Sequence, residues 1–133
     1  MGIFGFLKNE DQIDDEQLKN GEPYVELSTG LDDYENPSWS QVESAVHDVV
    51  DSEDSFATLS FVNYNLEVDT IQCIKDEEYY SFEALPAKDS EEFGKIYHKE
   101  SLTLEEVVEL FKTFYDTQKV IGYKAFIEDH FQE

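Results

Sequence analysis

Arginine is absent from this chain: its nine basic residues are all lysines, against 32 aspartates and glutamates. The guanidinium group is the usual partner for bidentate binding of phosphate, and affinity for nucleic acid comes mainly from basic side chains that displace counterions. A formal net charge of −23 also disfavours contact with an anionic membrane surface. The composition therefore argues against nucleic acid and membranes as partners.

Cysteine is almost absent as well, and Cys73 has no second cysteine with which to form an intramolecular disulfide. Its place in an apolar, extended stretch predicts a buried, unreactive thiol. His47, His98 and His130 fall in three separate predicted elements, and no two of them have the helical spacing typical of zinc ligands. We expect solvated or hydrogen-bonded histidines, no metal and no cofactor.

Long apolar runs are missing too. The apolar residues at the N-terminus, within residues 1–8, are too few to cross a membrane, and no small-residue cleavage site follows them. Phe6 breaks the pattern for myristoylation at Gly2. These absences predict a cytoplasmic protein.

What is present is enough for one domain. The chain has 133 residues, and 40% of them are hydrophobic, which suits a single domain with a real core. We expect residues 1–22 to form an N-terminal apolar turn and an acidic linker, and residues 23–133 to form a single α+β domain. The apolar turn either docks on that domain or remains a loose tag.

Five extended stretches predict the strands of this domain. Residues 56–62, 66–74 and 79–85 are rich in β-branched or aromatic residues and are bounded by turn formers, so they predict an antiparallel meander. Residues 23–28 alternate between apolar and polar and predict a first strand. Residues 93–98 predict a further strand after the meander.

The middle stretch of the meander changes phase. Leu66 and Val68 have even numbers, whereas Ile71 and Cys73 have odd numbers. Because side chains alternate between the two faces of a strand, a regular strand cannot place all four on one face. The sequence therefore predicts a bulge or a bend near residues 69–70.

A first amphipathic helix begins at Asn36 or at Ser38. Pro37 suits the first turn of a helix, and Ser38 with Gln41 fits a capping box. The apolar stripe that follows is rich in valine, so this helix must depend on docking against the sheet. We expect it to end in the acidic run of residues 51–54.

A second amphipathic helix begins with a capping box formed by Thr103 and Glu106, and Leu102 and Val107 stand where a hydrophobic staple requires them. Apolar residues then recur at helical spacing, and the helix is expected to end near Thr117.

The C-terminal tail, residues 123–131, is apolar enough to dock, and its pattern leaves its conformation open. The predicted order of elements is strand, helix, three or four strands, helix. Two amphipathic helices need one apolar sheet face to cover. The sequence therefore predicts an α+β fold, in which an antiparallel sheet of four to five strands carries both helices on one face.

Carboxylates gather in four short clusters, residues 32–35, 51–54, 76–78 and 91–92. None has the alternating ligands, central glycine and terminal glutamate of a calcium loop. Without a cleft to argue from, nothing selects a pair of them for glycoside chemistry, and Cys73 lacks the flanking residues of a nucleophile. The simplest interpretation is a set of solvated loops.

The alternative is a surface for a basic protein. A net charge of −23 opposes folding through self-repulsion, so solubility, a salt-rich habitat or a basic partner must explain it. Several clusters would then converge to receive lysine and arginine side chains, with nearby tyrosines as hot spots. The candidate partner-binding residues are Asp32, Asp33, Tyr34, Glu35, Asp51, Glu53, Asp54, Asp76, Glu77, Glu78 and Tyr79.

Three stretches carry a resemblance to a known family: Pro37-Ser-Trp-Ser-Gln-Val42, Ile71-Gln-Cys73 leading to Tyr80-Ser-Phe-Glu83, and Ser101-Leu-Thr-Leu-Glu-Glu-Val-Val-Glu-Leu-Phe111 with Tyr115. Over residues 23–116 the chain resembles the small acidic immunity proteins of bacterial polymorphic and contact-dependent toxin systems. The resemblance implies a non-enzymatic α+β protein that binds a co-encoded toxin domain and blocks it. It assigns no functional residues, because the toxin-facing surfaces of that family vary.

We therefore expect an immunity protein that covers the active site of a basic toxin domain, such as a nuclease, through its acidic loops. One alternative is an acidic mimic of nucleic acid that inhibits several DNA-binding proteins. A further alternative is a small enzyme or ligand-binding domain with a pocket between helix and sheet.

Overall fold

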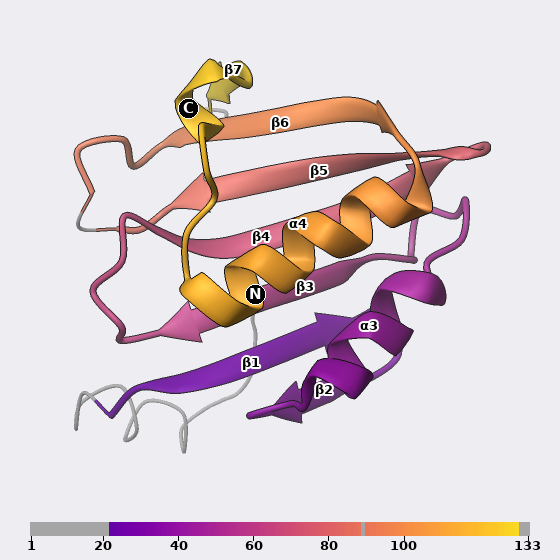
Figure 1. The fold of residues 1–133 in the computed structure, drawn as a ribbon, viewed down its shortest axis with the longest axis horizontal. Coiled ribbons are helices and arrows are strands. Elements are labelled where there is room, and N and C mark those ends of the chain that lie inside the picture. Colours follow the sequence, from indigo (N-terminus) through magenta and orange to yellow (C-terminus); the bar gives the residue numbers. More distant parts are fainter. Residues whose placement is uncertain (1–21, 89, 131–133) are drawn as a thin grey trace.

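The computed structural model describes residues 22–88 and 90–130. They form one antiparallel sheet with two α-helices on one side of it (Figure 1). The predicted apolar turn and acidic linker, residues 1–22, lie outside the described residues except for Glu22. The α+β class with helices on one face of an antiparallel sheet is confirmed.

The sheet has seven strands in the order β2-β1-β3-β4-β5-β6-β7, and every neighbouring pair is antiparallel. The strands are β1 (Tyr24–Thr29), β2 (Asp33–Glu35), β3 (Ala57–Val62), β4 (Val68–Asp76), β5 (Tyr79–Pro86), β6 (Lys95–Leu102) and β7 (Ile127–His130). The predicted count of four to five strands is wrong. All five predicted strands are present, and two short edge strands are added.

The two additional strands had weak sequence signals. β2 has only three residues, Asp33–Glu35, all of them exposed, and it pairs with β1 alone. A strand without an apolar face has no alternation to detect. β7 lies in the tail whose form the sequence left open, after a short 3-10 turn, η2 (Tyr123–Ala125). β6 also differs from its prediction, since it starts and ends later than residues 93–98.

The phase change in β4 is a bulge, as predicted. The pairing of β4 with β5 slips between Val68 and Thr70, so Val68 faces Pro86 while Thr70 faces Leu85. The extra residue, Asp69, absorbs the change from even to odd numbering. Val68, Ile71 and Cys73 are buried as a result.

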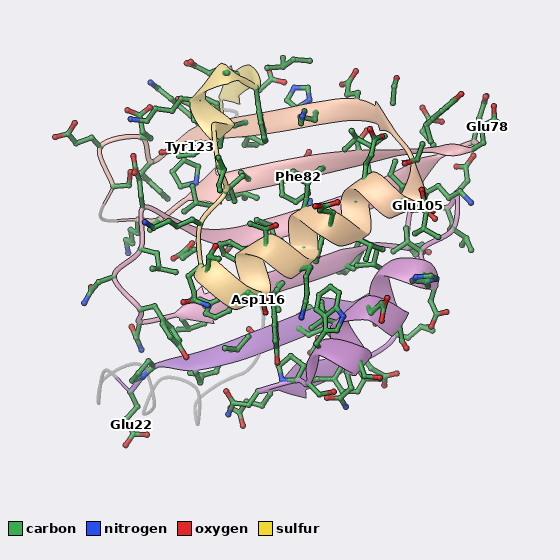
Figure 2. The ribbon with its side chains drawn as sticks, viewed as in Figure 1. Glu22, Glu78, Phe82, Glu105, Asp116 and Tyr123 are labelled. Carbon is green, nitrogen blue, oxygen red and sulfur yellow. The ribbon has the colours of Figure 1, made fainter. Side chains whose placement is uncertain are left out.

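The core lies between the sheet and the helices. Alternate residues of the central strands are buried beneath α4 (Leu104–Thr117), as the spacing predicted. Phe82 lies on the side of the sheet that carries α4 (Figure 2). Its ring lies 5.9 Å from that of Phe111, and the Phe61 ring lies 5.2 Å from that of Phe114, both edge to face. Each buried aromatic side chain removes a large apolar area from water.

The first helix, α3 (Trp39–His47), starts after Ser38, whose side chain forms the predicted capping box with Gln41. It ends at the Asp48 cap and not in residues 51–54, so the predicted C-terminus is wrong. Val49 is buried beyond the helix whereas Val50 is 54% exposed. Valine has a weak helix propensity, so the valine-rich stripe does not extend the helix through residues 49–50.

The second helix is predicted correctly at both ends. The Thr103 side chain accepts a hydrogen bond from the Glu106 amide at 3.2 Å, and the Thr103 amide donates to Glu106 Oε1 at 2.8 Å. Leu102 and Val107 are both buried beside this cap. α4 ends at Thr117, where Gln118 takes a left-handed conformation.

The two helices also contact each other directly. The Trp39 ring of α3 lies 5.7 Å from the Tyr115 ring of α4, and the Tyr115 hydroxyl donates to the Pro37 carbonyl at 2.9 Å. The start of α3 therefore lies beside the end of α4.

Replacing the cap tests its contribution to stability. We expect Thr103→Ala to lower the free energy of unfolding by about 1 kcal/mol, because the Glu106 amide loses its acceptor. Thr113→Ala in the middle of the same helix is the matched control and should be neutral or slightly stabilising. Urea denaturation measures both, and equal effects of the two substitutions would contradict the role of the cap.

Candidate functional site

Three of the predicted acidic clusters meet at one end of the sheet. β1 ends at Thr29 opposite Ala57, where β3 begins, and β4 runs past this point to Asp76 before β5 starts at Tyr79. The loops that carry the clusters therefore lie at the same end, on the right in Figure 1. We name this end the acidic pole. It comprises Asp32, Asp33, Asp51, Glu53, Asp54, Asp76, Glu77 and Glu78.

Two contacts tie the loops of the acidic pole together. The backbone amide of Glu77 donates to Asp51 Oδ2 at 2.9 Å. A Cβ atom at position 30 would collide with the carbonyl oxygen of Asp54, so only glycine lets these two loops approach so closely. The three loops thus form one connected surface.

The first turn of α4 extends the acidic pole, although the sequence indicated only a capping-box role for Glu106 there. β6 ends at Leu102, which pairs with Tyr80, so Glu105 and Glu106 follow at the same end of the sheet. Glu78 and Glu105 both lie toward this end in Figure 2.

Within the described residues, no lysine or histidine forms an ion pair with any of the eight carboxylates of the acidic pole. Lys75 is near, but its ammonium lies 5.4 Å from the centre of the Tyr80 ring. Uncompensated charge of one sign on neighbouring loops produces a potential that attracts cations.

Apolar side chains stand exposed among these charges. Tyr79 is 47% exposed, as expected for a contact residue, and Leu31 is 92% exposed. Val50 and Ile74 are also exposed close to the same loops. Leu31, Val50 and Ile74 are not among the contact residues predicted from the sequence. Leu31 could have been found from the sequence, because it is an apolar residue within a predicted polar loop.

Two predicted residues lie away from the acidic pole. Tyr34 and Glu35 belong to β2, where they pair with Leu27 and Glu26 toward the middle of β1. The fourth acidic cluster, residues 91–92, lies at the opposite end of the sheet, in the loop between β5 and β6.

The opposite end has paired carboxylates. Glu92 accepts hydrogen bonds from Lys95 at 2.9 Å and from Tyr97 at 2.8 Å, and these bonds lower the pKa of the Glu92 carboxyl. The Tyr123 hydroxyl donates to Glu67 at 2.6 Å and lowers the pKa of that carboxyl. The two ends of the sheet therefore differ in charge compensation.

This opposite end also holds a hollow of about 700 Å³, lined in part by Ser60, Asp69 and Thr70. Burial raises the pKa of the Asp69 carboxyl, which accepts a hydrogen bond from the Thr70 hydroxyl at 3.1 Å. The bulge in β4 places this carboxylate here.

The uncovered face of the sheet carries a chain of polar contacts. The Thr58 hydroxyl donates to Gln72 Oε1 at 2.9 Å, and Gln72 Nε2 donates to Glu83 Oε1 at 2.8 Å. The polar atoms of these side chains thus form hydrogen bonds with one another across β3, β4 and β5. The face therefore needs no helix to cover it.

Cys73 is buried in the core, as predicted, and burial raises the pKa of its thiol to about 12. The thiolate is the reactive form of cysteine, so this thiol is a poor nucleophile at neutral pH. His47 is exposed on α3, whereas His98 on β6 lies 3.1 Å from Asp129 and 3.3 Å from Glu100. The side chain of His130 lies outside the described residues.

Comparisons with known proteins found no matching family model, no matching curated protein and no matching solved structure. In the part of the chain that the structure describes, no helix has the length and apolar character needed to span a bilayer. Nor do the described residues contain a group of three or more His, Cys, Asp or Glu side chains arranged to hold a metal ion.

The half-buried carboxylate of Asp69 at the bulge predicts a pH-dependent stability. The folded-state pKa of Asp69 is raised above its unfolded value, so the penalty on the folded state begins as the pH rises past the unfolded-state pKa and is complete above the folded-state pKa. We expect Asp69→Asn to raise the free energy of unfolding at about pH 7 and to leave it nearly unchanged at about pH 3, below the ordinary aspartate pKa.

Urea denaturation at the two pH values measures this difference. Asp76→Asn removes the same charge from the exposed end of β4 and is the control for general relief of repulsion. A neutral-pH destabilisation by Asp69→Asn would show that the ionised carboxylate contributes to stability through its hydrogen bond.

Proposed function

We propose that this chain is an inhibitor of the immunity-protein kind, which binds a basic protein toxin domain through the acidic pole and covers the toxin's active site. The observation that supports the proposal is the convergence of three acidic loops around exposed apolar side chains such as Leu31 and Tyr79. Hot spots of protein interfaces combine apolar or aromatic anchors with a polar rim. The acidic pole has both parts.

The proposed mechanism has two stages. The uncompensated carboxylates attract the cationic partner over a distance of about one Debye length and raise the association rate. The apolar side chains are then buried against the toxin, while its lysines and arginines pair with the surrounding carboxylates. Basic groups that would hold nucleic acid in a nuclease are thereby occupied.

The clustering of charge around exposed apolar side chains favours one protein partner over mimicry of nucleic acid. A duplex carries about one negative charge per 1.7 Å along its axis. Here the eight carboxylates of the acidic pole, which have no ion pair within the described residues, gather at one end of the sheet, with Leu31 and Val50 exposed among them. We therefore infer a dedicated interface and not a general decoy for DNA-binding proteins.

The direct test is co-expression with the basic C-terminal domain of a secreted protein encoded beside this chain. The proposal expects the domain to be toxic alone and harmless when this chain is present, with a stable complex on size exclusion. Capture of several unrelated DNA-binding proteins would favour the nucleic-acid mimic. Turnover of a small metabolite without any protein complex would refute both.

Charge removal at the acidic pole gives a quantitative prediction. We expect Glu77→Gln with Glu78→Gln to slow association several-fold at low salt and to have little effect at high salt, because salt screens exposed charges. Stopped-flow association with the toxin domain measures the rate.

The matched control is Glu22→Gln with Glu91→Gln. Both double variants change the net charge from −23 to −21, but the control residues are exposed at the other end of the sheet. Equal rates for the two double variants would show that only total charge matters, and the acidic pole would then have no special role.

A further inference from the structure

A groove of about 460 Å³ runs between α3 and α4. Its apolar residues are Trp39 of α3 and Leu104 and Val108 of α4, which are partly buried against the core. The helices pack on the sheet with their buried faces, so these three side chains leave apolar surface accessible within the groove. It lies on the two helices and not on the three loops of the acidic pole, and it shares only Glu105 with the helix turn that extends that pole.

The rim of the groove is acidic. Glu43 lines it from α3, and Glu105 and Glu109 line it from α4. The lysine in the groove, Lys112, holds its ammonium 4.9 Å from the centre of the Trp39 ring and 3.4 Å from Asp116. The face of Trp39 thus already accepts a cation, as the electron-rich face of an indole favours.

We propose that this groove is a docking site for a cationic amphipathic segment of another protein, with an aliphatic side chain flanked by lysines or arginines. The aliphatic side chain would enter between Trp39 and Val108. The flanking cations would meet Glu43 and Glu109 on the two sides of the groove. This inference goes beyond the proposed function and does not depend on the acidic pole.

Charge favours a cationic segment over a second copy of this chain as the occupant of the groove. A symmetric dimer through the groove would bring Glu43, Glu105 and Glu109 of each copy together, and both copies carry a net charge of −23. Like charges at an interface oppose association. A cationic segment removes that cost and gains the same apolar contact.

The groove contains its own reporter, because Trp39 is the only tryptophan of the chain. Tryptophan emission therefore reports on the surroundings of Trp39 in the groove. The full chain is titrated with a synthetic helical peptide that has leucine on one face and lysine on the other. A peptide with glutamate in place of lysine is the control. We expect the lysine peptide to shift the emission saturably and the glutamate peptide to leave it unchanged.

Two pairs of variants locate the site. Val108→Lys blocks the groove, and Ile121→Lys adds the same charge at a position that is 75% exposed in the loop after α4. Glu109→Lys reverses a rim charge at an exposed position, and Glu91→Lys reverses an exposed charge at the other end of the sheet. Circular dichroism checks that each variant is folded.

We expect the two groove variants to weaken peptide binding by about tenfold or more, which is about 1.4 kcal/mol per factor of ten, and the two controls to change it little. Glu77→Gln with Glu78→Gln should retain binding. That result separates this inference from the proposed function, since each can fail alone.

Three results would overturn the proposal. The first is an emission spectrum that does not respond to the lysine peptide. The second is a chain that sediments as a dimer and that Val108→Lys dissociates, which would assign the groove to a second copy. The third is a response that occurs only after removal of residues 1–21, which would assign the groove to the chain's own apolar N-terminal residues.

Discussion

The burial of one face of the sheet beneath two helices is the interaction on which the structure depends. Alternate residues of the central strands, such as Leu59 and Phe82, are fully buried, and the rings of Phe111 and Phe114 meet the sheet edge to face. This apolar layer must offset the repulsion of a net charge of −23. With the core on one side of the sheet, the charges occupy the loops, the helix surfaces and the sheet ends.

The sequence predicts the fold where periodicity and capping agree. The alternation in β3 and β5, the phase change near Asp69 and the capping box at Thr103 each identify a local structure that the fold contains. The strand count was wrong because β2 and β7 are edge strands that depend on pairing with β1 and β6. Pairing with a neighbouring strand leaves little signal in a short polar stretch such as Asp33–Glu35.

The candidate site was partly predictable for a similar reason. The acidic clusters are visible in the sequence, but their meeting at one end follows from the antiparallel order of the strands. That order also separates residues 91–92 from the other clusters. The exposed Leu31 and Val50 were missed because exposure depends on the ends of β1 and α3, and the groove at Trp39 depends on how two helices pack. The chemistry of each side chain can be read from the sequence, whereas the set of side chains that share a surface is determined by the tertiary fold.

The edge strands have a further consequence for behaviour at high concentration. An unpaired strand edge is a template for another strand, and proteins commonly protect such edges with charged side chains and short length. β2 is short, and its Asp33 and Glu35 are exposed. Two molecules approaching edge to edge there would place carboxylates against carboxylates. The same acidity that opposes folding therefore resists fibril-like stacking along this edge.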